Sequence, residues 1–241
     1  MDTALARRQF DRRLYLTAGI LFPLLIFVGF APTYYLKGLF GRPPLPSNLV
    51  HLHALVMTLW VVMFVVQVRL ISAKQVRLHQ TLGYAGIGLA ALVLMTGLPT
   101  AMRAAKYGST AAPPDIPPLS FMIVPVADLV MFALFFTAAV IYRRRAAEHK
   151  RLMLLTAINF LPPALGRIPI APLQALGPLW FFGSPTALAL LCIVLDARRH
   201  GRVNRMFVLG TALLVVSYVA RIALMGTHAW INFATWLTTF V

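Results

Sequence analysis

Three ionisable side chains interrupt long apolar runs of this 241-residue chain: Asp128 in PVADLVMF, Arg167 in LPPALGRIP and Arg221 in SYVARIAL. Inside a membrane such groups cost about 3 kcal/mol or more, so each needs a partner or a function. Their distances along the expected helices place Asp128 near the midplane and both arginines in the outer half. We therefore predict an Asp128–Arg167 ion pair. Arg221 either reaches the outer surface or leaves a positive field that suits a carboxylate or phosphate.

Two histidines open the apolar run NLVHLHALVMTLW at residues 48–60. His51 and His53 are two residues apart, so a regular helix points them in nearly opposite directions and they cannot serve one site. The spacing puts His53, Trp60, Phe64 and Gln67 on one face of that helix. His53 is therefore the expected ligand or hydrogen-bond donor, and His51 is expected at the membrane interface.

These polar groups predict a pocket in the outer leaflet lined by His53, Asp128, Asn159, Arg167 and Arg221. Histidines can bind haem iron, and arginines can pair with carboxylates such as haem propionates. Haem b or a quinone, in a redox role, is thus the first hypothesis for its ligand, with His53 as the candidate metal ligand. Two alternatives remain open, a small-molecule or lipid transporter and a non-catalytic assembly subunit of a respiratory complex. Whether the chain is an enzyme is also left open.

Three further histidines stand among basic residues, in RLHQTLG (His79), EHKRLM (His149) and RRHGRVNR (His200). Each lies near the end of an expected helix on the same side of the membrane. They are either interfacial side chains or, because imidazole is a common metal ligand, candidates to converge on a metal.

Two of the expected helices contain breaks. In NFLPPALGRIP, Pro162 and Pro163 remove the donors that would bond the carbonyls of Ile158 and Asn159. FFGSPT supplies a second interruption at Gly183, Ser184 and Pro185. Irregular backbone at membrane depth is found where it is buried in protein or lines a cavity, so these breaks favour either a packing kink or a pocket.

The elements that must position these residues are membrane helices. Hydrophobic residues make up 60% of the chain, charged residues make up 12%, and the mean hydropathy is +0.80. This composition excludes an ordinary soluble globule and predicts an all-α, polytopic bundle in one integral-membrane domain over 1–241. Cys192 lies in an apolar run as the only cysteine. We predict seven spans, at 14–36, 49–71, 82–102, 119–142, 152–173, 178–196 and 206–226, followed by a short interfacial tail with Trp230 and Trp236.

Charge predicts the direction of these spans. All but six of the 22 Lys and Arg fall on one side when the loops alternate; the exceptions are Lys37, Arg42, Arg103, Lys106, Arg167 and Arg221. The positive-inside rule then puts the N-terminus in the cytoplasm and the C-terminus outside. The net charge of +16 is explained by orientation, because the basic residues form short clusters between apolar runs, so nucleic acid is not an expected partner. The bilayer is the expected partner, and a second copy or a respiratory complex is left open.

His53, Gln67 and LHQTLGYAG, with His79, Leu82 and Gly83, resemble a group of uncharacterised bacterial integral-membrane proteins with a similar spacing of His, Gln and HRxLG. Gln80 stands here in place of the arginine of that last motif. HKRLM at 149–153 resembles a turn in small membrane proteins, some of which are connected with assembly of haem-copper oxidases. The resemblance covers the second and third spans and the start of the fifth. It implies a multi-pass protein of the bacterial cytoplasmic membrane and leaves its activity open.

Overall fold

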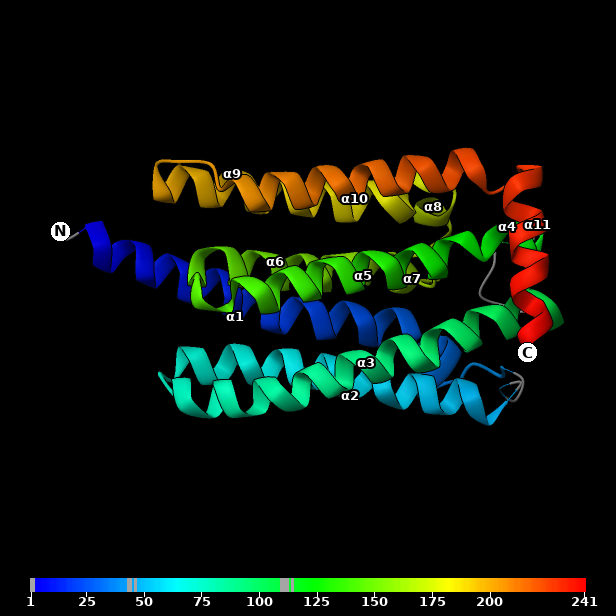
Figure 1. Ribbon diagram of the computed structural model, residues 1–241, viewed down its shortest axis with the longest axis horizontal. Helices are drawn as coiled ribbons and strands as arrows, with labels where there is room; N and C mark the ends of the chain where they lie inside the picture. Colours follow the sequence, from blue (N-terminus) through cyan, green and yellow to red (C-terminus); the bar gives the residue numbers. More distant parts are fainter. Residues whose placement is uncertain (1–2, 43–44, 46, 109–112, 114) are drawn as a thin grey trace.

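The computed structural model describes residues 3–42, 45, 47–108, 113 and 115–241, and this part of the chain is helical without strands. Its long helices run along one axis in three layers (Figure 1). The upper layer holds α9 (Ser184–His200) and α10 (Arg205–Leu224). The lower layer holds α2 (Asn48–Ser72) and α3 (Val76–Tyr107). The central layer holds α1 (Thr3–Phe30), α5 (Ile123–Ile141), α6 (Ala146–Asn159) and α7 (Leu161–Leu165).

Six helical stretches are long and apolar enough to cross a membrane, and they agree with six of the predicted spans. They are Leu5–Tyr35, Asn48–Ser72, Val76–Tyr107, Pro118–Arg144, Leu179–His200 and Arg205–Leu224. Short elements extend several of them: η1 (Ala31–Tyr35) follows α1, α4 (Pro118–Phe121) precedes α5, and η2 (Tyr142–Arg144) follows it. The chain is therefore a multi-pass helical membrane protein.

The remaining predicted span, the fifth along the chain at 152–173, was wrong as a single helix. It consists of α6 and α7, separated at Phe160, and of α8 (Ala171–Gln174) beyond a non-helical stretch. The break occurs where the sequence predicts it, because Pro162 and Pro163 lack the amide hydrogens that would continue the helix. From Arg151 to Asn159 every residue of α6 except Met153 is buried. The bundle thus encloses α6, which packs against α5 and α10.

The predicted interruption before Pro185 takes the form of a π-helical turn, η3 (Leu179–Gly183), which leads directly into α9. Single π turns inside helices are frequent at functional sites. The C-terminal tail forms α11 (His228–Leu237) and η4 (Thr238–Phe240). Figure 1 shows α11 lying across the end of the bundle, and the Trp230 indole N–H donates to the Leu119 carbonyl at 2.9 Å.

Candidate functional site

An ion pair between Asp128 and Arg221 lies inside the bundle, where α5 packs against α10. Arg221 Nη1 donates to Asp128 Oδ1 at 2.5 Å, and its Nε donates to Ser217 Oγ at 3.2 Å. Only 3% of Asp128 and 1% of Arg221 is exposed. Burying either charge alone would be costly, and their pairing compensates part of that cost.

Asn159 joins this pair from the last position of α6. Its Nδ2 donates to the backbone carbonyl of Asp128 at 2.9 Å. The side chain can reach α5 there because α6 stops at Asn159 and the two prolines turn the chain into α7. The broken helix therefore positions a polar residue against the ion pair.

Two aromatic rings lie beside the Arg221 guanidinium. Tyr218 and Phe182 stack with ring centres 4.5 Å apart and planes 29° apart. The guanidinium carbon lies 5.2 Å from the centre of the Tyr218 ring and 5.9 Å from that of Phe182. Phe182 comes from the π turn η3, so both irregular segments of the chain contribute to one site. We call Asp128, Asn159, Tyr218 and Arg221 the Asp128 cluster.

Three polar atoms of the Asp128 cluster are buried without a hydrogen-bond partner among the described residues. They are Arg221 Nη2, Asn159 Oδ1 and the Tyr218 hydroxyl. An unsatisfied buried polar atom costs about 1–3 kcal/mol, and native structures seldom leave one without water or a ligand. A donor, an acceptor and a hydroxyl that can be either are thus available in one place.

The predicted Asp128–Arg167 pair was wrong. Arg167 instead donates through Nη1 to the Pro163 carbonyl at 2.6 Å and lies over the Phe30 ring, 4.7 Å from its centre. Depth along a helix gives the level of a side chain but not the helix that it faces. Arg167 follows α7, which packs against α1, whereas Asp128 faces α10. Arg221 consequently neither reaches the surface nor remains unneutralised.

His53 lies away from the Asp128 cluster, on the side of α2 that packs against α3. Its Nδ1 is 3.1 Å from the Thr96 hydroxyl, and its ring borders Gly97. His51 is exposed, with its ring 6.0 Å from that of Tyr34. The two histidines diverge as the helical geometry predicts. Of the five residues predicted to line a pocket, the structure brings together Asp128, Asn159 and Arg221, and it places His53 and Arg167 elsewhere.

At the basic end of the bundle, where the N-terminus and the turns α2–α3, α5–α6 and α9–α10 lie, two of the three candidate metal-binding histidines meet. The ring centres of His79 and His149 are 6.2 Å apart, with an angle of 82° between the planes. Gln67 of α2 contacts His79, and His149 Nδ1 is 2.8 Å from the Ala139 carbonyl. His200 contacts neither ring and bonds elsewhere, so convergence of all three histidines was wrong.

His200 belongs to an ionic network that the sequence reasoning missed. Arg151 Nη2 donates to both carboxylate oxygens of Asp196, at 2.7 and 2.8 Å, and its Nε donates to Oδ2 at 3.0 Å. His200 Nδ1 lies 3.3 Å from Asp196 Oδ1, and its Nε2 lies 3.5 Å from Asp11 Oδ1. Lys150 pairs with Asp11 at 2.6 Å. The sequence did contain a sign of this network. The chain has only six Asp and Glu, and one of them, Asp196, lies at the end of a predicted span, where it could pair with a basic residue.

Asp11, Asp196 and His200 place their ligand atoms within 4.8 Å of one another, a spacing that could hold a metal ion. Both carboxylates, however, already neutralise a cation, Lys150 or Arg151. A divalent ion would have to displace these partners. We therefore describe this network as a set of salt bridges that link α1, α6 and α9.

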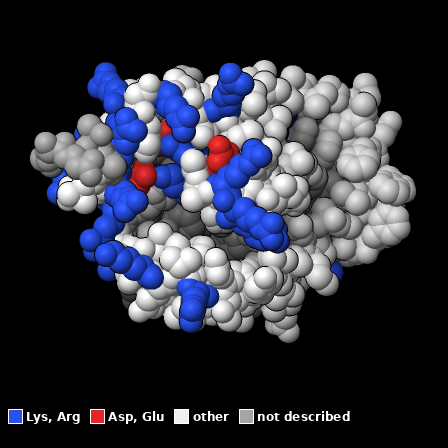
Figure 2. All heavy atoms as spheres, turned by 60° about the vertical axis from the view of Figure 1, so that its left-hand side comes forward, with Lys and Arg blue, Asp and Glu red and all other residues white. Residues whose placement is uncertain are grey.

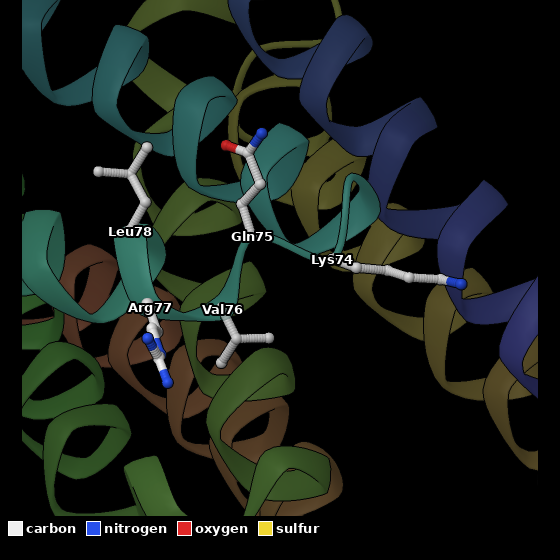
Figure 3. A pocket seen from close by; sticks show the side chains of 5 residues that line it. All are labelled: Lys74, Gln75, Val76, Arg77 and Leu78. Carbon is white, nitrogen blue, oxygen red and sulfur yellow. The ribbon is translucent and has the colours of Figure 1, made fainter.

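Figure 2 shows the basic end, where Lys and Arg side chains surround a few acidic ones and the surface is hollowed. A shallow depression also lies at the α2–α3 turn, lined by Lys74, Gln75, Val76, Arg77 and Leu78. In Figure 3 the Lys74 and Arg77 side chains extend away from each other, so they do not converge on a common point. The residues that line this depression therefore do not form a binding or catalytic site.

Comparison with other proteins does not assign the Asp128 cluster. The chain matches no protein-family model, no curated protein and no solved structure. Its function must therefore be inferred from its own residues.

Proposed function

We propose that this chain is a quinone-binding protein of the bacterial cytoplasmic membrane, with seven passes and its basic end in the cytoplasm, and that the Asp128 cluster holds the quinone head group. The observation that carries the proposal is the set of buried polar atoms without partners: Arg221 Nη2, Asn159 Oδ1 and the Tyr218 hydroxyl.

The chemistry of these atoms suits both redox states of such a ligand. A quinone carbonyl accepts hydrogen bonds, which Arg221 Nη2 and the Tyr218 hydroxyl can donate. A quinol hydroxyl can donate, and Asn159 Oδ1 can accept. The Phe182–Tyr218 stack provides an aromatic surface beside these groups for a planar ring.

Charge also favours a neutral ligand over an anion. Asp128 already compensates Arg221, and both are buried. An added anion would leave one uncompensated negative charge in a low-dielectric interior, whereas a quinone leaves the cluster neutral. A quinone dissolves in the bilayer and can approach the bundle from its lipid-facing side. His53 is outside this proposal because its Nδ1 is already hydrogen-bonded to Thr96 of α3.

Binding of a short-chain ubiquinone to the detergent-purified protein tests the proposal. We expect saturable quenching of tryptophan fluorescence, and about fivefold weaker binding by Tyr218→Phe, which removes one hydrogen bond worth about 1 kcal/mol without changing charge. Tyr84→Phe is the matched control, since Tyr84 is 75% exposed. Absence of saturable binding by the wild type, or equal affinity in Tyr218→Phe, would overturn the proposal.

A second candidate, a proton-coupled carrier of small carboxylates, is favoured by the two irregular segments that meet at the cluster. Transporters commonly build their substrate sites from interrupted helices. A substrate carboxylate could replace Asp128 on Arg221 if Asp128 took up a proton. This candidate predicts carboxylate uptake into proteoliposomes that depends on a pH gradient and is lost in Asp128→Asn but kept in Asp115→Asn, whose side chain is exposed. Quinone binding without uptake would exclude it.

A further inference from the structure

Two imidazoles from distant parts of the chain meet at the basic end. Neither belongs to the Asp128 cluster. We infer that His79 of α3 and His149 of α6 form a two-histidine site for a monovalent copper ion, held between their Nε2 atoms. The site does not depend on the quinone proposal. Its basis is the ring geometry, the groups that hold each Nδ1 and the charge of the surroundings.

The separation of the rings fits a shared metal ion. A metal–imidazole bond is about 2 Å long, so two imidazoles that bind one ion from opposite sides place their ring centres about 6 Å apart. The observed separation is 6.2 Å, and the planes are 82° apart. Both rings are only partly buried, so an ion can reach them from water at the end of the bundle.

The hydrogen bond of His149 leaves its Nε2 ready to coordinate. Its Nδ1 lies 2.8 Å from the Ala139 carbonyl, which can only accept, so Nδ1 carries the proton. The lone pair of the neutral ring is then on Nε2. Metal-binding histidines commonly donate their other N–H to a carbonyl or carboxylate in this way, which fixes both the tautomer and the ring orientation.

Gln67 can support either tautomer of His79. With its NH2 group toward the ring, Gln67 donates to His79 Nδ1 at 2.5 Å and to the His79 carbonyl at 3.2 Å, and its Oε1 accepts from the Gly83 amide at 3.2 Å. Coordination by Nε2 moves the proton of His79 to Nδ1. Rotation of the Gln67 amide by half a turn then presents Oε1 to that proton, in exchange for the bonds that Gln67 makes with the His79 carbonyl and the Gly83 amide in the empty state.

The surroundings select a soft ion of low charge. Imidazole binds copper and zinc, thioethers favour monovalent copper, and the Met63 sulfur lies 3.8 Å from the Gln67 amide. The basic residues around this end of the bundle (Figure 2) oppose any added positive charge, and a divalent ion adds twice as much as a monovalent one. No carboxylate of the described residues contacts either ring to offset it.

Titration of the tag-free, detergent-purified protein with Cu⁺ under reducing conditions, against a chromophoric Cu⁺ chelator, tests the site. We expect one Cu⁺ per chain, and at least 100-fold weaker binding by His79→Ala and by His149→Gln. Gln67→Leu should weaken binding about 10- to 100-fold, the usual effect of removing a group that orients a metal ligand. His51→Ala and His228→Ala are the matched controls and should bind as the wild type does.

The site is refuted if the wild type does not compete with the chelator, if His79→Ala or His149→Gln retains full affinity, or if Zn²⁺ binds more tightly than Cu⁺. Gel filtration and an unchanged thermal unfolding midpoint show that each variant is folded. Ubiquinone binding, measured separately on the same proteins, distinguishes failure of this site from failure of the quinone proposal.

Discussion

Three arginines show three ways in which this bundle accommodates a guanidinium away from bulk water. Arg221 pairs with Asp128 through one guanidinium nitrogen, and Arg151 binds Asp196 through two guanidinium nitrogens. Arg167 uses a backbone carbonyl and an aromatic face. The sequence identified Arg167, Arg221 and Asp128 as buried groups, because an ionisable residue in an apolar run is recognisable. It could not identify their partners, since partner choice depends on which faces of the helices meet.

Loss of one member of the Asp128–Arg221 pair should destabilise the protein strongly. Arg221→Met leaves Asp128 buried without its cation, which costs about 3–5 kcal/mol. The double variant Asp128→Leu/Arg221→Met removes both charges and should recover much of that loss. Reversible unfolding of the detergent-solubilised protein by a denaturant measures the coupling.

Arg167→Met provides the comparison, because it removes one hydrogen bond to a carbonyl and one contact with Phe30, together about 1–2 kcal/mol. Purely additive effects of Asp128→Leu and Arg221→Met would mean that the two side chains do not stabilise each other.

At the scale of elements, the central helix α6 and its break organise the molecule. Apolar runs predicted the six unbroken spans to within a few residues, except that α1 begins earlier than predicted and α3 extends further at both of its ends. The prolines predicted the break after Asn159, but hydropathy alone joined the two sides of it into one span. Which neighbours close around a broken helix is decided by packing, and the sequence pattern does not encode it directly.

The contact between α1 and α7 predicts a steric test. Gly29 packs directly on the backbone of Ala164, and a Cβ at position 29 would overlap the Ala164 carbonyl. Gly29→Ala should therefore force the two helices apart and cost about 1–3 kcal/mol or more. Gly88→Ala in α3 is the same chemical change with open space around it, and it should be neutral or slightly stabilising. Thermal unfolding in detergent compares the two, and equal midpoints would contradict the close α1–α7 packing.

At the scale of the whole molecule, the two chain ends lie at opposite ends of the bundle (Figure 1). Six crossings alone would return the chain to its starting side. In the proposed arrangement the segment from α6 to α7 is a further pass, although it lacks the length and continuity of the other six. The odd number of passes stays a prediction from charge and hydropathy.

The direction of the bundle can be measured by labelling. In a Cys192→Ser background, Arg202→Cys at the basic end and Asp115→Cys at the other end provide single thiols. With the basic end in the cytoplasm, a membrane-impermeant maleimide added to intact cells should label position 115 and spare position 202 until the membrane is opened. Labelling of both positions from outside, or of 202 alone, would contradict the predicted orientation.

The burial of α6 has a consequence for how the protein is made. From Arg151 to Asn159 this helix is enclosed almost entirely by protein, so its neighbours stand between it and the lipid. During synthesis, however, Arg151 emerges long before Asp196, and Asn159 emerges before Tyr218 and Arg221. A nascent chain that ends before α9 thus has a polar, proline-broken segment with few of its final partners. We expect α6 of such a chain to stay outside the bilayer core. The helix should enter the membrane only after α9 and α10 have been synthesised and can pack against it.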